Sequence, residues 1–188
     1  LTGNAEWKER AEHARKFVQS MWDAQEHKFW SGTGGDGITV FRDVVPVDVQ
    51  AWALLALKED SVPYWKGLTY ADAMHRVGRG YDFNQDSDGI WFEGTAQMAL
   101  AFMVKGEPGR RNSIVHFLKS TQDESGGVMA ADRDALSTGF YQQDGTPWLY
   151  YKRLHVAATS WLVLAERSAN PFWLGSRQDS SLAMADQD

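Results

Sequence analysis

Two acidic residues stand at matching places in two apolar segments of the chain. The segment that begins at Asp48 aligns without a gap over the segment that begins at Glu93, so that Leu55 meets Leu100. An acid at a helix start is favoured by free backbone N–H groups, and both residues can therefore be plain helix-terminal acids. The same pair also suits glycoside hydrolysis, in which one carboxylic acid protonates the leaving oxygen and the other carboxylate activates water or attacks directly. We therefore take Asp48 and Glu93 as candidate catalytic residues.

The neighbours of the two acids suggest a role for each. Glu93 follows Trp91 and an adjacent phenylalanine. A half-buried apolar setting of this kind raises the pKa of a carboxyl group and suits it to act as the acid. Asp48 is followed by the polar Gln50, so we expect it to stay ionised and serve as the base. We expect Gln97 to be among the residues that bind the substrate.

A third apolar segment has no acid at the matching position, which is occupied by Ala157. Rings and basic groups come just before it: Tyr150, Tyr151, Lys152, Arg153 and His155. This cluster can hydrogen-bond sugar hydroxyls or neutralise a uronate. His155 is either a proton shuttle, because its ordinary pKa lies near neutrality, or a satisfied histidine at a helix start. A polysaccharide lyase would use a tyrosine–histidine pair of this kind, with a basic residue on the substrate carboxylate.

Nine tryptophans are an unusual number for 188 residues. Four of them lie beside glycine or aspartate in apparent loops: Trp30, Trp91, Trp148 and Trp173. A sugar ring stacks its C–H face on an aromatic plane, although tryptophan is also often only partly buried at helix ends. We expect the first three of these tryptophans to bind sugar.

The segment that begins at Asn84 is rich in oxygen-bearing side chains. Asn84, Asp86 and Asp88 resemble the first half of a calcium-binding loop, but Thr95 stands where the bidentate glutamate should be. An Asp-rich turn before a helix explains the same pattern. We therefore expect neither a metal nor a cofactor, with calcium at these three residues as the alternative.

The spacing of apolar residues predicts six helices and no alternating strand longer than a few residues. The expected helices span residues 5–21, 48–57, 69–77, 93–104, 108–121 and 154–166. Each apolar helix follows an Asp-Gly loop, and the three helices align with one another. Repeats of roughly 50 residues predict about three helical hairpins in an all-α fold.

Four segments carry a resemblance to a known family: FWSGTGGDG (29–37), PVDVQAWALLAL (46–57), DGIWFEGTAQMA (88–99) and PWLYYKRLH (147–155). They resemble the α/α-toroid proteins of the six-hairpin glycosidase type. The resemblance implies a toroid of about six hairpins, whose inner helices point their N-termini at one carbohydrate cleft. About three hairpins fall within this chain. We therefore expect a partial toroid over residues 1–173 and a polar C-terminal tail over residues 174–188.

Composition excludes several other classes of protein. The net charge of −6 argues against a nucleic-acid partner, which requires clustered Lys and Arg. No apolar run approaches the roughly 18–20 residues that span a membrane. The absence of cysteine excludes disulfides, zinc ribbons and thiol nucleophiles. The cellular location stays open, with a secreted or periplasmic one favoured.

These observations favour a carbohydrate-active hydrolase that cleaves poly- or oligosaccharides, although whether the chain is an enzyme stays open. The first alternative is a lyase or epimerase acting on uronate-containing sugars. The second is a non-catalytic module that binds glycans or another chain. An open edge of apolar helices also predicts a homodimer.

Overall fold

The computed structural model describes residues 3–172, so Trp173 and the tail expected over residues 174–188 lie outside the described residues. The helices are α1 (Ala5–Ser20), α2 (Val47–Leu57), α3 (Lys66–Met74), α4 (Phe92–Val104), α5 (Pro108–Lys119) and α6 (Val156–Glu166), with the short 3-10 helix η1 (Lys58–Tyr64) after α2. The strands are β1 (Trp22–Asp23), β2 (Lys28–Phe29), β3 (Arg76–Val77), β4 (Gly80–Tyr81), β5 (Leu136–Tyr141) and β6 (Pro147–Tyr150). They pair as three antiparallel two-stranded sheets, in chain order.

The expected all-α toroid is wrong, because the fold combines helices with small sheets. Helices make up 46% of the structure, and the three sheets connect and flank them. In β5 the side chains of Leu136 and Thr138 are buried, as in an ordinary strand. Gly139 follows at a positive φ of 74°, and the pairing register shifts between Ser137 and Tyr141. This irregularity hides the two-residue period of β5 in the sequence. Each strand of the other two sheets is only two residues long, so it has no period to detect.

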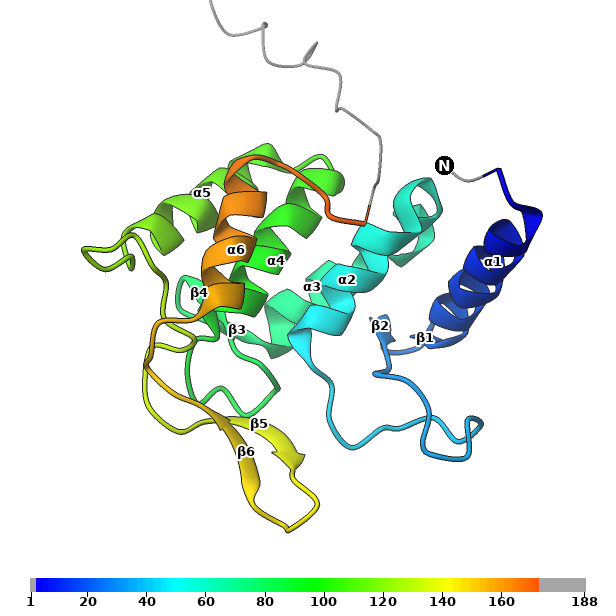
Figure 1. Cartoon of the computed structure of the whole chain (residues 1–188), viewed down its shortest axis with the longest axis horizontal. Helices are drawn as coiled ribbons and strands as arrows, with labels where there is room; N and C mark the ends of the chain where they lie inside the picture. The colour runs from blue at the N-terminus through cyan, green and yellow to red at the C-terminus, as the bar shows by residue number, and fades with distance from the viewer. Residues whose placement is uncertain (1–2, 173–188) are drawn as a thin grey trace, which may run out of the picture.

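Helix α4 lies at the centre of the fold and packs against α2, α5 and α6 (Figure 1). Every residue from Gly94 to Phe102 is buried, as expected for a helix that is apolar on all sides. In contrast, α1 has no buried residue and stands beside α2 at one end of the molecule. No helix within residues 3–172 combines the length and the apolar character needed to cross a membrane.

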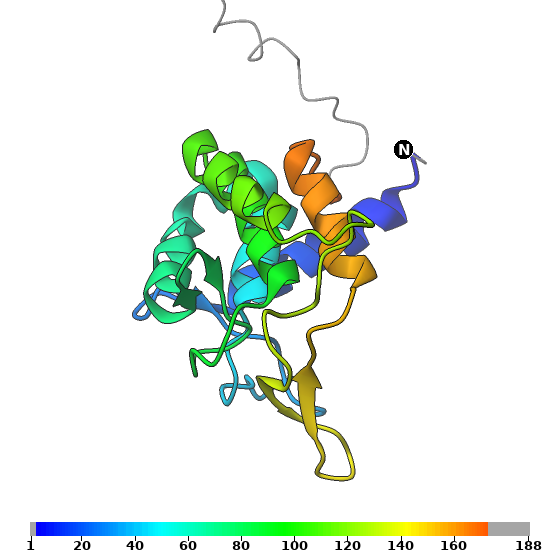
Figure 2. The same cartoon turned by 90° about the vertical axis from the view of Figure 1, so that its left-hand side faces the viewer.

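The N-termini of α2, α4 and α6 face the same end of the molecule, from which the β5–β6 hairpin projects (Figures 1 and 2). Backbone hydrogen bonds between the connecting segments hold these helix starts together. The N–H of Val47 donates to the carbonyl of Phe83 at 2.8 Å, and the N–H of Phe92 donates to the carbonyl of Ala130 at 3.0 Å. The fold therefore gathers the first turns of three helices at one place.

Candidate active site

Asp48 and Glu93 lie in the first turns of the neighbouring helices α2 and α4. Burial raises the pKa of Asp48 to about 6 and is the larger cause of the rise in the pKa of Glu93 to about 7. The negative charge of Asp48 is the second cause for Glu93, so the two carboxylates interact. The structure therefore brings both predicted acids into one site.

Glu93 contacts two further residues from the predicted set. The side-chain N–H of Gln97 donates to Oε1 of Glu93 at 3.2 Å, one helical turn away on α4. Nδ1 of His155, the residue just before α6, lies 3.7 Å from Oε2 of Glu93. Burial lowers the pKa of His155, so burial favours the neutral form of both the histidine and the glutamate. This arrangement can hold a proton on Glu93 near neutral pH.

Aromatic rings form one wall of the site. Tyr150 stacks on Trp91 with ring centroids 5.4 Å apart, and it contacts the ring of His155 edge-on at 6.0 Å. Burial raises the pKa of Tyr150 to about 12, and the charges of Glu93 and Asp48 add to this rise. The phenol therefore lies near both carboxylates and keeps its proton at neutral pH.

Buried polar atoms without a hydrogen-bond partner are concentrated at this site. Four of the seven such side-chain atoms within residues 3–172 belong to its members: Oδ1 of Asp48, Nε1 of Trp91, Oε1 of Gln97 and Nδ1 of His155. A buried polar atom without a partner is costly and needs an explanation. A polar ligand that enters the cluster would supply the missing hydrogen bonds.

The other predicted sugar-binding residues differ in how much of each side chain is exposed. Trp91 is only 2% exposed, so it presents no free ring face to a sugar. Trp148 is 55% exposed on β6 in the projecting hairpin. Tyr151 is also exposed, and the guanidinium of Arg153 lies 5.2 Å from the centre of its ring. These last three side chains therefore have room for a ligand.

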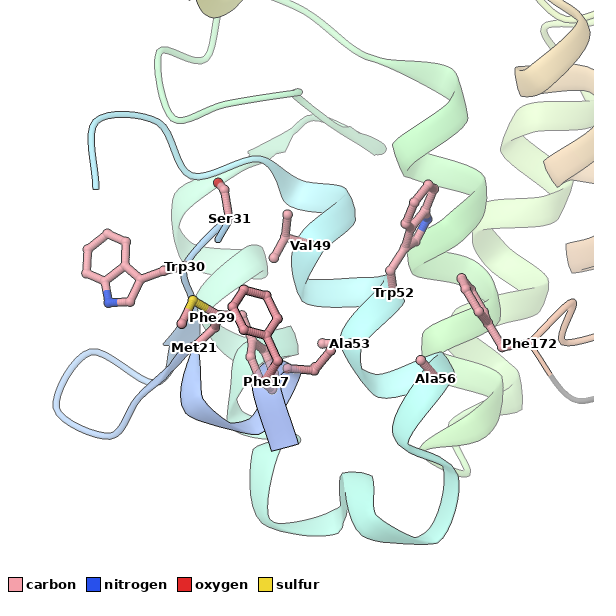
Figure 3. Close-up of a pocket in the computed structure, with 11 residues that line it drawn as sticks. Phe17, Met21, Phe29, Trp30, Ser31, Val49, Trp52, Ala53, Ala56 and Phe172 are labelled. Atoms are coloured by element: carbon pink, nitrogen blue, oxygen red, sulfur yellow. The ribbon is translucent and has the colours of Figure 1, made fainter. Parts of the chain in front are cut away.

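Trp30 lies in a different place, at a groove between α1 and α2 (Figure 3). This groove encloses about 240 Å³. Its lining is apolar except for Ser31: Phe17, Val18, Met21, Phe29, Trp30, Ser31, Val49, Trp52, Ala53, Ala56 and Phe172. A site without converging polar groups cannot do acid–base chemistry. The homodimer expected from unpartnered helices stays a prediction.

Three aspartates gather in the loop before α4, and the sequence pattern identified two of them. One oxygen from each of Asp82, Asp86 and Asp88 lies within 4.8 Å of the others. Asn84, a ligand only in the calcium alternative, accepts the backbone N–H of Asp86 with its side-chain oxygen at 2.7 Å. The backbone N–H of Asp88 donates to both Asp82 and Asp86, as in an ordinary Asp-rich turn. Calcium at this loop stays the alternative to the expected absence of a metal.

Asp82 was missed because its side chain lies outside the alternating pattern that begins at Asn84. It is fully buried, and its pKa is raised to about 7 by burial, by the side chain of Asp86 and by the charge of Asp88. The available signal was its place at the head of a short stretch that holds three aspartates.

Comparison with protein-family models finds none that matches the chain, and comparison with curated proteins finds no similar relative.

The partly buried charge of Asp48 predicts an unusual dependence of stability on pH. Its folded-state pKa of about 6 lies above the ordinary value of 3.8, so the folded state binds the proton more tightly. This group therefore lowers the unfolding free energy as pH rises from about 4 to 6, and this loss of stability is complete above about pH 7. The difference in unfolding free energy between Asp48→Asn and the wild type should therefore be about 2 kcal/mol more favourable to the variant at pH 7.5 than at pH 4.5. Urea unfolding at the two pH values measures this, and an equal difference at both would contradict it.

Proposed function

We propose that the protein is a carbohydrate-active hydrolase that cleaves a glycosidic bond with Glu93 and Asp48. The observation that carries the proposal is the interacting pair of carboxylates at adjacent helix starts, each with a raised pKa. Within residues 3–172 no lysine or arginine forms an ion pair with either acid. The resemblance to six-hairpin glycosidases supports only this chemistry and not the fold, because the structure is not the toroid that the resemblance implied.

The different pKa values of the two acids give them different roles in the proposed reaction. Near pH 6.5 a substantial fraction of Glu93 is protonated while Asp48 is mostly ionised. Glu93 donates its proton to the glycosidic oxygen as the C–O bond breaks and the aglycone leaves. Asp48 either removes a proton from the attacking water or attacks the sugar carbon itself, and water then completes the hydrolysis.

A lyase is supported less well by the same geometry. A lyase that uses Tyr150 as its base needs the phenolate, whereas the raised pKa of Tyr150 keeps the proton in place. Arg153 is exposed, lies against Tyr151 and forms no ion pair with either carboxylate within residues 3–172. Two acids without a lysine or arginine partner within residues 3–172 repel a uronate. The proposed substrate is therefore a neutral poly- or oligosaccharide.

A reducing-end assay over neutral and acidic polysaccharides tests the proposal. The wild type should release reducing ends from a neutral glycan, without the absorbance of an unsaturated uronate. Asp48→Asn should lose this activity, while Asp43→Asn, a control at an exposed aspartate, should keep it. Absorbance of an unsaturated product would favour the lyase. No product from any substrate would contradict the hydrolase and favour a glycan-binding module.

The same pair predicts a bell-shaped dependence of kcat/KM on pH. Activity should fall on the acid side as the pair takes up its second proton, and on the alkaline side as Glu93 loses the proton that it donates. The two apparent pKa values should lie near 6 and 7, and they belong to the coupled pair. The optimum should therefore be narrow and lie between them. A rate that is constant from pH 5 to pH 9 would exclude both acids from the rate-determining step.

A further inference from the structure

A second pocket lies away from the carboxylate pair and is lined by arginines. It encloses about 160 Å³ between the β3–β4 hairpin and α5, which lie beside each other (Figures 1 and 2). The lining residues are Arg76, Arg79, Tyr81, Arg110, Ser113 and Ile114. None of them forms a hydrogen bond or an ion pair with Asp48 or Glu93. The pocket therefore shares no lining residue with the proposed active site.

Arg110 is held rigidly at one side of this pocket. Its guanidinium makes two hydrogen bonds of 2.6 Å to the two carboxylate oxygens of Asp72. It also lies 3.6 Å from the ring centre of Phe102. The hydroxyl of Tyr81 donates to the same Asp72 at 2.7 Å. A guanidinium fixed in this way loses little conformational entropy when it binds a further acceptor.

Arg76 and Arg79 lie on the other side and have no carboxylate partner within residues 3–172. Nε of Arg76 donates to the carbonyl of Gly78 at 3.3 Å, and the guanidinium of Arg79 lies 4.9 Å from the ring centre of Phe117. Both contacts leave most of the guanidinium N–H groups available. They also orient the two side chains within the short hairpin.

The charges in the pocket do not cancel. Three guanidinium groups line the pocket, and only that of Arg110 is hydrogen-bonded to a carboxylate, that of Asp72. Glu107 lies 3.8 Å from Arg110 but is closer to Lys105, at 2.7 Å. The pocket is therefore positive in a chain whose net charge is −6. An oxyanion can accept several charge-assisted hydrogen bonds from such a set.

We propose that this pocket binds a phosphate group, either as inorganic phosphate or as a small phosphomonoester. Arg76 and Arg79 supply the uncompensated charge, Arg110 supplies an ordered donor, and the hydroxyl of Ser113 supplies a neutral one. The volume of about 160 Å³ admits a phosphate group and leaves little room for a large substituent. This inference does not depend on the proposed hydrolase function.

Isothermal titration calorimetry at constant ionic strength tests the proposal with inorganic phosphate and, separately, with glycerol 3-phosphate. At least one of them should bind saturably to the wild-type protein, with a dissociation constant of about 0.1–10 mM. Tighter binding of the ester would identify a phosphomonoester as the ligand, and similar or tighter binding of inorganic phosphate would identify the free anion. Chloride at the same ionic strength should not compete.

Arg76→Gln and Arg79→Gln should each weaken phosphate binding by about tenfold, and the double variant should abolish saturable binding. Both side chains are exposed, so circular dichroism and the melting temperature should stay close to those of the wild type. Arg10→Gln removes an equal charge from an exposed site on α1 and should leave phosphate affinity unchanged. Unchanged affinity in the double variant would overturn the proposal. Failure of both ligands to bind the wild type up to about 50 mM would also overturn it.

Discussion

Glu93→Gln should lower kcat on a neutral glycan by about 10²–10⁴-fold while the protein stays folded. Glutamine keeps the size of the side chain and the hydrogen-bonding capacity toward Gln97, but it has no acidic proton to donate. Burial and the charge of Asp48 raise the pKa of Glu93 to about 7, so the variant also removes an unfavourable buried charge. Its unfolding free energy at pH 8 should equal or exceed that of the wild type.

Reducing-end kinetics and urea unfolding on the same preparations separate catalysis from folding. Glu124→Gln is the matched control, because Glu124 is exposed and the chemical change is identical. The control should keep the kcat of the wild type. If Glu93→Gln kept the full wild-type kcat, Glu93 would not be the acid. A loss of both activity and stability would instead mean that the carboxylate is structural.

Gly94→Ala should destabilise the fold by about 3 kcal/mol, although alanine favours helices more than glycine does. A Cβ atom at this position of α4 would lie 2.3 Å and 2.6 Å from ring atoms of Trp91 and 2.8 Å from the side chain of Val47. Neither neighbour has free space, since Trp91 is 2% exposed and Val47 is fully buried. Overpacking therefore outweighs the gain of about 1 kcal/mol in helix propensity.

Gly109→Ala is the control for this comparison. Gly109 lies in the first turn of α5, and a Cβ atom there would meet nothing within 4 Å. This variant should be neutral or more stable by up to about 1 kcal/mol. The midpoints of urea unfolding give both values. Similar midpoints for the two variants would mean that Trp91 moves aside at little cost, and the tight packing behind Glu93 would then be unimportant.

Local features of the sequence were enough to locate most of the helices. The apolar residues of the segment 93–104 predict a buried helix, and α4 spans Phe92–Val104 with nearly all of its residues buried. The expected start at Asp48 is one residue from the observed start of α2 at Val47. Apolar periodicity and acids at helix starts are encoded by neighbouring residues, so these features are visible without a structure.

The small sheets were not predictable in the same way. A two-residue strand has no period to detect, and in β5 the glycine at position 139 breaks the alternation. Local propensity therefore indicated helices and loops alone, and the fold class was wrong.

Both the sequence and the tertiary structure were needed to say which residues belong to the candidate site. The sequence by itself determined which acids begin the apolar helices and which rings and bases precede the third of them. Only the tertiary structure placed Tyr150 and His155 beside Glu93, and it placed Trp30 and the exposed Trp148 elsewhere. It also decided the raised pKa values, because burial and the approach of charges arise from packing between segments far apart in the chain.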